Sequence, residues 1–173
     1  MRAWVVGTPA PIDAGPLHRI ERPLPEPAPR SDPRRRAVLR RCRTDLHLAE
    51  GDLPQRRRDV TPGHEVVGLV AATGAGVTRF RLGDRVGVPW LVGTDGTCRF
   101  CPRGDENLRT TPSFTGWDVD DGYAAACLAD ERFAHRLPDG LSDEQAAPLL
   151  YAGIIGYRAM RCADVPPGGQ LGI

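Results

Sequence analysis

The segment from residue 64 to residue 88, HEVVGLVAATGAGVTRFRLGDRVGV, places the strongest constraint on the fold. Its valine-rich runs have the length of strands, and the glycine turns TGAG and LGD separate them. A short strand is also predicted over residues 2–6, RAWVV, and another within GYAAACLAD, which ends at Asp130. We therefore expect a mainly β fold with helices.

Helices are expected in two regions. Residues 44–53 can form one or two helical turns that Gly51 closes. The run from Ser142 to Gln145 is a capping box, which predicts a helix start, and a second helical stretch is expected from about Ala152 to Cys162. Residues 170–173 resemble the beginning of a strand, so we expect the chain to stop inside a further domain.

Composition excludes several classes of protein. Apolar residues make up 40% of the chain, enough for a packed core, and the net charge of +1 argues against a dedicated nucleic-acid binder. Without a run of about 18 apolar residues, no membrane span is expected. The N-terminus has no apolar signal region, so we expect a cytoplasmic protein.

Three clusters of residues could carry chemistry: Cys42–His47, Gly63–Glu65 and Cys98-x-x-Cys101. Each signal is weak alone, because a lone Cys is usually core, a His after Gly is usually a loop residue and CxxC occurs by chance. Five cysteines in a chain expected to be cytoplasmic favour metal binding or chance over a disulfide framework.

In this order, the clusters resemble zinc-dependent alcohol dehydrogenases of the medium-chain dehydrogenase/reductase family, together with MRAWVV, GDLP, TPGHEVVG, GDRVGVPW and LSDEQAAPLL. The resemblance implies a GroES-like β-barrel catalytic domain over residues 1–150. Residues 151–173 would be a linker helix and the start of a truncated Rossmann domain. NAD or NADP would then bind beyond this chain, and the intact parent is expected to be a homo-oligomer.

The resemblance also implies a set of metal ligands. Cys42 and His64 would bind a catalytic zinc, and Glu65 would sit just behind the metal and exchange onto it. Asp45 would hydrogen-bond the other ring nitrogen of His64. The zinc would polarise a small-molecule alcohol while hydride passes to the nicotinamide, with aldehydes or ketones as products.

Further roles follow from the same resemblance. Thr44 would take the alcohol proton and His47 would pass it toward solvent, although a helix cap and a surface histidine are the alternatives. Arg43 would lie near the cofactor pyrophosphate, unless it is an ordinary exposed arginine. Leu53 and Trp90 would line the alcohol pocket, with a core position as the alternative for Trp90.

The sequence departs from the family at both zinc sites. Tyr151 stands where the third catalytic ligand is usually Cys, and its neutral phenol implies weaker zinc binding. The four structural-zinc positions are Asp95, Cys98, Cys101 and Arg109. Because Arg is always protonated and cannot bind a metal, we expect the structural zinc to be lost, with the two cysteines left as free thiols or an adventitious site.

A third departure is rich in arginine. Seven of the fourteen residues from Arg30 to Arg43 are Arg, and no strand or helix period survives there. Because the family has an apolar strand at this place, we interpret residues 31–41 as a pair of compensating frame changes that removes a barrel strand. The runs Arg34–Arg36 and Arg56–Arg58 are interpreted as solvated loops.

The remaining cysteines have structural interpretations. Cys127 is expected in a strand and Cys162 at a helix end.

Four functions remain open. One is a zinc- and NAD(P)-dependent alcohol dehydrogenase of which this chain is an incomplete part, inactive alone. Another is a non-catalytic remnant with at most weak zinc binding. A zinc-free reductase such as a quinone oxidoreductase is disfavoured by Cys42 and His64. A CxxC redox module would need a βαβ context that the Gly-rich loop does not offer. Zinc content separates the first two, and reversible CxxC oxidation would support the last.

Overall fold

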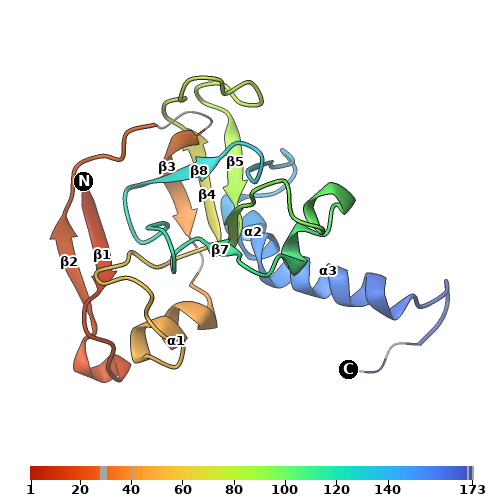
Figure 1. Cartoon of the computed structure of the whole chain (residues 1–173), viewed down its shortest axis with the longest axis horizontal. Coiled ribbons are helices and arrows are strands. Elements are labelled where there is room, and N and C mark those ends of the chain that lie inside the picture. The colour runs from red at the N-terminus through yellow and green to blue at the C-terminus, as the bar shows by residue number, and fades with distance from the viewer. Residues whose placement is uncertain (28–30, 40, 171, 173) are drawn as a thin grey trace.

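The computed structural model describes residues 1–27, 31–39, 41–170 and 172. The chain begins with a hairpin-like pair of antiparallel strands, β1 (Arg2–Val6) and β2 (Leu17–Glu21), which lies beside the main sheet (Figure 1). Isolated bridges from Ala3 to Ala124 and from Val6 to Val60 join β1 to the rest of the molecule. The strand predicted over residues 2–6 is therefore confirmed.

The main sheet has five antiparallel strands in the order β8-β3-β4-β5-β9. Their bounds are Ala126–Asp130 for β8, Ser31–Leu39 for β3, Val66–Val70 for β4, Arg85–Val88 for β5 and His135–Arg136 for β9. The two strands predicted within residues 64–88 are β4 and β5, which pair directly, with Val66 opposite Val88. The strand predicted to end at Asp130 is β8.

The arginine-rich segment corrects two expectations. Residues 31–39 form β3, which pairs with β4 on one side and β8 on the other, so the expected loss of a barrel strand is wrong. The run Arg34–Arg36 lies within this strand and is not a loop. Strand pairing uses backbone groups, which every residue except proline offers in full, so two neighbouring strands can pair with a segment that has no apolar period. A register shift between Arg36 and Val38 marks an irregularity in the pairing.

Residues 90–122, which lie between β5 and β8 in the sequence, form a largely irregular lobe. A short antiparallel pair within it is formed by β6 (Leu91–Gly93) and β7 (Ser113–Phe114). Two single-turn 3-10 helices, Cys101–Arg103 and Glu106–Leu108, lie between these strands and form the green segment of Figure 1.

The helices follow the sequence signals. Helix α1 (Arg43–Glu50) ends at Gly51, whose φ of 90° is the left-handed conformation that favours glycine. Helix α2 (Asp143–Ala146) begins with the predicted capping box, in which the Ser142 side chain accepts from the Gln145 amide. A 3-10 turn, Ala147–Leu150, leads into α3 (Ala152–Ala163). No helix among the described residues is long and apolar enough to cross a membrane.

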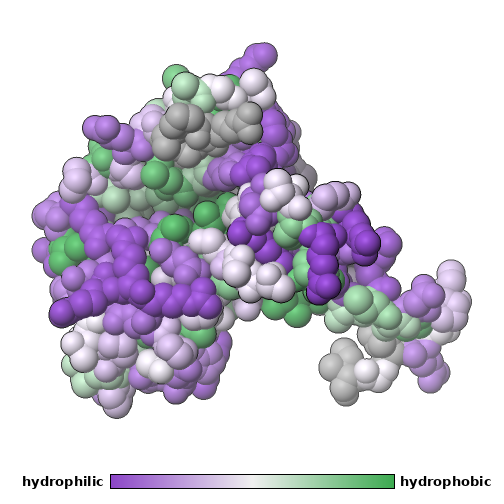
Figure 2. All heavy atoms as spheres, viewed as in Figure 1, coloured by the Kyte–Doolittle hydropathy of each residue, from purple (hydrophilic) through white to green (hydrophobic). Residues whose placement is uncertain are grey.

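The core is built from small clusters on the two faces of the sheet. Val66, Val88, Cys127 and Ala129 pack on one face, and Val67 packs on the other against the segment that enters α3. Cys127 is thus a buried strand residue and Cys162 an exposed residue near the end of α3, as expected. Helix α3 buries no residue and projects away from the sheet (Figures 1 and 2).

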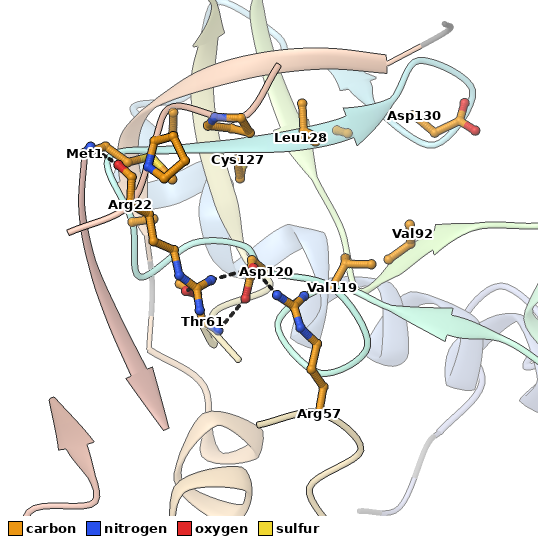
Figure 3. Close-up of a pocket in the computed structure, with 15 residues that line it drawn as sticks. Met1, Arg22, Arg57, Thr61, Val92, Val119, Asp120, Cys127, Leu128 and Asp130 are labelled. Carbon is orange, nitrogen blue, oxygen red and sulfur yellow. Dashed lines mark hydrogen bonds and ion pairs between the residues drawn. The ribbon is translucent and has the colours of Figure 1, made fainter. Parts of the chain in front are cut away.

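Charged side chains join segments that are far apart in the sequence. The Asp120 carboxylate accepts from the guanidinium groups of Arg22 at 2.6 Å and Arg57 at 2.7 Å, and from the Thr61 amide at 2.8 Å (Figure 3). These groups stand at one side of a 350 Å³ pocket. Arg56–Arg58 is exposed as expected, yet two of its members make ion pairs, Arg56 with Asp118 and Arg57 with Asp120.

Candidate functional site

Asp45 organises the centre of the candidate site. It is the third residue of α1, and its carboxylate is only 6% exposed. One oxygen, Oδ2, accepts from the backbone amide of Cys42 at 3.0 Å. The other, Oδ1, accepts from the amide of Gly63 at 3.0 Å and lies 3.1 Å from His64 Nδ1. Asp45 therefore joins the start of α1 to the segment that leads into β4.

The ring of His64 is buried and held in one orientation. Its exposed fraction is 1%, and Trp90 and Tyr151 contact it edge-on, with ring centroids 4.6 Å and 4.8 Å away. Because a carboxylate only accepts, the tautomer of the neutral ring that fits this contact has its proton on Nδ1 and its lone pair on Nε2. Nε2 is buried and has no hydrogen-bond partner within the described part of the chain. A buried nitrogen of this kind suits a metal ligand.

Gly63 makes this arrangement possible. Its φ is 100°, and a Cβ there would meet Tyr123 at 2.9 Å and the Gly122 backbone at 3.0 Å. A larger residue would therefore displace the amide that binds Asp45.

Cys42 supplies a thiol at the N-terminus of α1. Its residue is the N-cap, and its Sγ lies 3.8 Å from Thr44 Oγ1. A Cys sulfur is one of the donors that zinc prefers in proteins. Cys42 and His64 thus carry donor atoms of the kinds that zinc binds. Glu65 is 2% exposed and its Oε1 accepts from the Ala152 amide at 3.4 Å, so it lies against the start of α3.

A third ligand is missing from this centre. Over the described residues, the one group of three His, Cys, Asp or Glu donors within 4.8 Å of one another is Asp95, Cys98 and Cys101, which excludes Cys42 and His64. Tyr151, which the sequence places at the third-ligand position, lies instead with its ring against His64. The centre therefore offers two good donors and an aromatic wall.

A pocket of about 460 Å³ opens beside this centre. The residues that line it are Thr44, His47, Asp52, Leu53, Trp90 and Tyr151. Four of the residues predicted for proton transfer or the pocket wall, Thr44, His47, Leu53 and Trp90, are thus brought together. Its lining combines apolar and aromatic side chains with hydroxyl groups, one imidazole and the Asp52 carboxylate.

Arg43 lies apart from this pocket. It is the first residue of α1 and is exposed. The structure leaves its predicted role at a pyrophosphate untested.

Several contacts of the site have no signal in the sequence. His47 Nδ1 lies 2.9 Å from Asp52 Oδ2, so the imidazole of the predicted relay is oriented by a carboxylate. Trp90 stacks on Phe114 with centroids 4.7 Å apart, and Trp117 extends the stack. Burial and the adjacent Asp45 carboxylate raise the pKa of Tyr123, which keeps that phenol neutral. Of these contacts, only the His47–Asp52 pair joins residues close in the sequence, five positions apart, so only that pair could have been suggested by spacing.

The lobe contains a second cluster. Asp95 Oδ1 accepts from the amides of Thr97 at 3.0 Å and Cys98 at 3.1 Å, while Arg109 Nη2 lies 3.2 Å from Oδ2. Those two amide hydrogen bonds are the main reason the pKa of Asp95 is lowered. The sulfurs of Cys98 and Cys101 lie 3.1 Å apart. At the position where relatives have a fourth metal ligand, this chain thus has Arg109, which pairs with the Asp95 carboxylate.

Comparison with protein families gives one match. The model described as "Alcohol dehydrogenase GroES-like domain" matches residues 37–139. That match covers β4, β5, β8 and both clusters described above.

Curated relatives agree with this match. The chain is 49% identical over its whole length to a protein named probable alcohol dehydrogenase AdhA from Mycobacterium tuberculosis, and covers 51% of it. It is 42% identical to an alcohol dehydrogenase of Geobacillus stearothermophilus, where the match covers 76% of this chain and 40% of that protein. The chain therefore spans about half or less of the length of these relatives.

Solved structures share the fold. A cinnamyl alcohol dehydrogenase from Sorghum bicolor superposes with a TM-score of 0.84 at 29% identity, over 95% of this chain and 49% of the other. An enzyme named CAD from Helicobacter pylori, solved with NADP(H), gives 0.81 at 25% identity over 95% and 50%.

Proposed function

Because the chain belongs to the alcohol dehydrogenase GroES-like domain family, we propose that it is the zinc- and substrate-binding part of an NAD(P)-dependent alcohol dehydrogenase. The observation that carries this proposal is the buried, unpartnered Nε2 of His64, whose Nδ1 faces Asp45. A buried imidazole lone pair needs a hydrogen-bond donor or a Lewis acid as its partner, and a zinc ion is a Lewis acid.

Zinc would be held by Cys42 and His64, with further ligands from solvent or substrate. When bound, the metal would lower the pKa of a coordinated alcohol and so favour loss of its proton. Thr44 and His47 line the adjoining pocket. Thr44 would accept the hydroxyl proton, and His47, oriented by Asp52, would pass it to solvent. Leu53 and Trp90 would pack on the carbon chain of the alcohol.

Nicotinamide cofactor would be supplied from outside the described residues, with Arg43 near its pyrophosphate. The exposed guanidinium of Arg43 at the start of α1 is free of the pocket and suits a phosphate. Alcohols and aldehydes are accordingly the proposed substrates of the whole protein, with the oxidised and reduced nicotinamide as its co-substrate.

The metal part of this proposal is tested with cobalt(II) as a spectroscopic substitute for zinc. The test uses a 173-residue chain in which Cys98→Ser and Cys101→Ser remove the two thiols of the second cluster. This chain should show a thiolate-to-cobalt absorption band that is lost when Cys42→Ser is added and kept when Cys162→Ser, the matched control on exposed α3, is added instead. Added imidazole should shift the cobalt bands, because a coordination position is open. A band that survives in Cys42→Ser would contradict the proposed centre.

Turnover is tested in a chimaera that joins residues 1–151 to the remaining part of the mycobacterial relative. Reduced nicotinamide should form from primary alcohols, and more of it when Tyr151→Cys completes the ligand set. A folded, zinc-loaded chimaera without turnover in either form would contradict the enzymatic role.

Non-catalytic metal binding is the second candidate function. The observation that favours it is Tyr151, whose ring lies against His64 where a ligand is expected. It would be supported by a chimaera that binds cobalt through Cys42 yet forms no reduced nicotinamide.

A further inference from the structure

In the lobe between β6 and β7, the charge of the Asp95 carboxylate is compensated by protein groups. Asp95 receives two amide hydrogen bonds on one oxygen and the Arg109 guanidinium on the other. The Arg109 side chain is 18% exposed, so this ion pair is partly shielded from water. A zinc ion here would approach a fixed guanidinium cation, and only three donors would face it. These residues therefore do not fit a closed four-ligand zinc site.

The two sulfurs are closer than a zinc ion would hold them. Two thiolates on one tetrahedral zinc, each at about 2.3 Å, would lie about 3.8 Å apart. The Cys98 and Cys101 sulfurs lie 3.1 Å apart instead. The turn that joins them is tight, because the Cys101 amide donates to the Cys98 carbonyl at 3.2 Å. Cys98 is partly exposed, so a small molecule can reach its sulfur.

Cys98 is the better nucleophile of the pair. The Cys101 thiol hydrogen-bonds to its sulfur, and the amides of Cys101 and Phe100 also point at it, so the pKa of Cys98 is lowered. The same thiol–thiol contact raises the pKa of Cys101. Of the two thiols, Cys98 is thus the one that ionises more readily.

We propose that Cys98 and Cys101 form a dithiol site that small-molecule disulfides oxidise to an intrachain disulfide, in the place where relatives with four ligands would hold a metal. The Cys98 thiolate attacks one sulfur of the small disulfide, forms a mixed disulfide and expels one thiolate. Cys101 then loses its proton to solvent and attacks Cys98 Sγ, which closes the ring and expels the second thiolate. Two protein thiols are oxidised and one small disulfide is reduced to two thiols.

The Asp95–Arg109 pair allows both states of this site. The Cys101 sulfur also lies 3.7 Å from Asp95 Oδ1, but this carboxylate has two amide hydrogen bonds and the Arg109 guanidinium besides. The lobe therefore keeps its ion pair whether the dithiol is open or closed. Cys162 provides an internal comparison, because it is exposed on α3 and the structure pairs it with no second thiol. It can form only a mixed disulfide with a small molecule.

The test uses the whole 173-residue chain, stripped of metal, with oxidised glutathione as the probe and peptide mapping by mass spectrometry as the readout. The peptide with Cys98 and Cys101 should lose two hydrogens and carry no glutathione, whereas Cys162 should carry one. In Cys101→Ser the closing thiol is gone, so glutathione should accumulate on Cys98. Cys162→Ser, the matched control, should close its dithiol at the wild-type rate.

Two results would overturn the proposal. One is a wild-type chain in which Cys98 keeps glutathione or stays reduced while Cys162 reacts. The other is zinc protection: if one equivalent of zinc blocks oxidation of this pair in a Cys42→Ser chain, the lobe is a metal site. Failure of the zinc and alcohol chemistry at Cys42 and His64 would leave these readouts unchanged, so the two proposals fail separately.

Discussion

His64 Nδ1 and Asp45 Oδ1 lie 3.1 Å apart in a site where the two side chains are 1% and 6% exposed. The carboxylate that orients this imidazole also binds the amide of Cys42, so one side chain positions both proposed zinc ligands. A metal centre whose ligands share such a support should respond sharply when the support is changed.

Asp45→Asn should weaken cobalt or zinc binding by about 10- to 100-fold, since an amide can no longer accept at every one of these contacts and the His64 tautomer is released. A competition titration against a chromophoric chelator measures the change. Asp52→Asn is the matched control, because Asp52 contacts His47 and leaves His64 in place. Equal affinities in the two folded variants would contradict the role of Asp45.

Tyr151→Cys should raise zinc affinity by at least about tenfold, because a thiolate at this position adds a third strong ligand next to His64. The same chelator titration applies. Tyr157→Cys adds a thiol to an exposed position of α3 and should leave the affinity unchanged. An equal gain in zinc affinity in both variants would mean that the added thiol binds zinc independently of Cys42 and His64, which would contradict this prediction.

Arg109→Cys should create a second metal site in the lobe, because it removes the guanidinium from Asp95 and adds the missing thiolate beside Cys98 and Cys101. Cobalt bound per chain should rise by one equivalent. Arg103→Cys, which changes an exposed residue of the same lobe, should add none. The idea fails if Arg109→Cys gains no metal while it stays folded.

Glu131 should make stability depend on pH. Its Oε2 accepts from the amides of Arg79 and Thr78, each at 2.9 Å, and these bonds lower the pKa of Glu131 below 4.5. The carboxylate therefore contributes stability above the unfolded-state pKa, and that contribution is lost as the pH falls through the lower folded-state pKa.

Glu131→Gln should cost about 1–3 kcal/mol in the free energy of unfolding at pH 7, since charged acceptors make the stronger hydrogen bonds. The deficit relative to wild type should shrink below about pH 4. Urea titrations at several pH values measure it. Glu26→Gln changes an exposed carboxylate and should show a flat, small difference. A constant deficit at all pH values would contradict the role of the charge.

Local sequence patterns predicted the elements whose signals are short in range. The valine runs of β4 and β5, the Gly51 end of α1 and the Ser142 capping box each depend on residues within a few positions. Strand β3 had no such signal, because its backbone is paired by β4 and β8 from elsewhere in the chain.

The candidate site was accessible mainly through the resemblance to a family. Asp45 and His64 are 19 positions apart, and no periodicity joins them. The stack of Trp90 on Phe114 and the Arg109–Asp95 ion pair depend on how the lobe folds back, which composition does not encode. What the sequence could supply was the identity of the donors, such as a thiol at 42 and an imidazole at 64.

Helix α3 has a consequence for handling the protein. Ile154, Ile155, Tyr157 and Met160 are 47–65% exposed on a helix that projects from the sheet. Exposed apolar side chains of this kind favour association between molecules. A net charge of +1 provides little electrostatic repulsion to oppose it. At high concentration, aggregation of this chain should therefore depend mainly on the 12 residues of α3, which lie outside the core. A few acidic substitutions on that helix should raise the solubility of the chain.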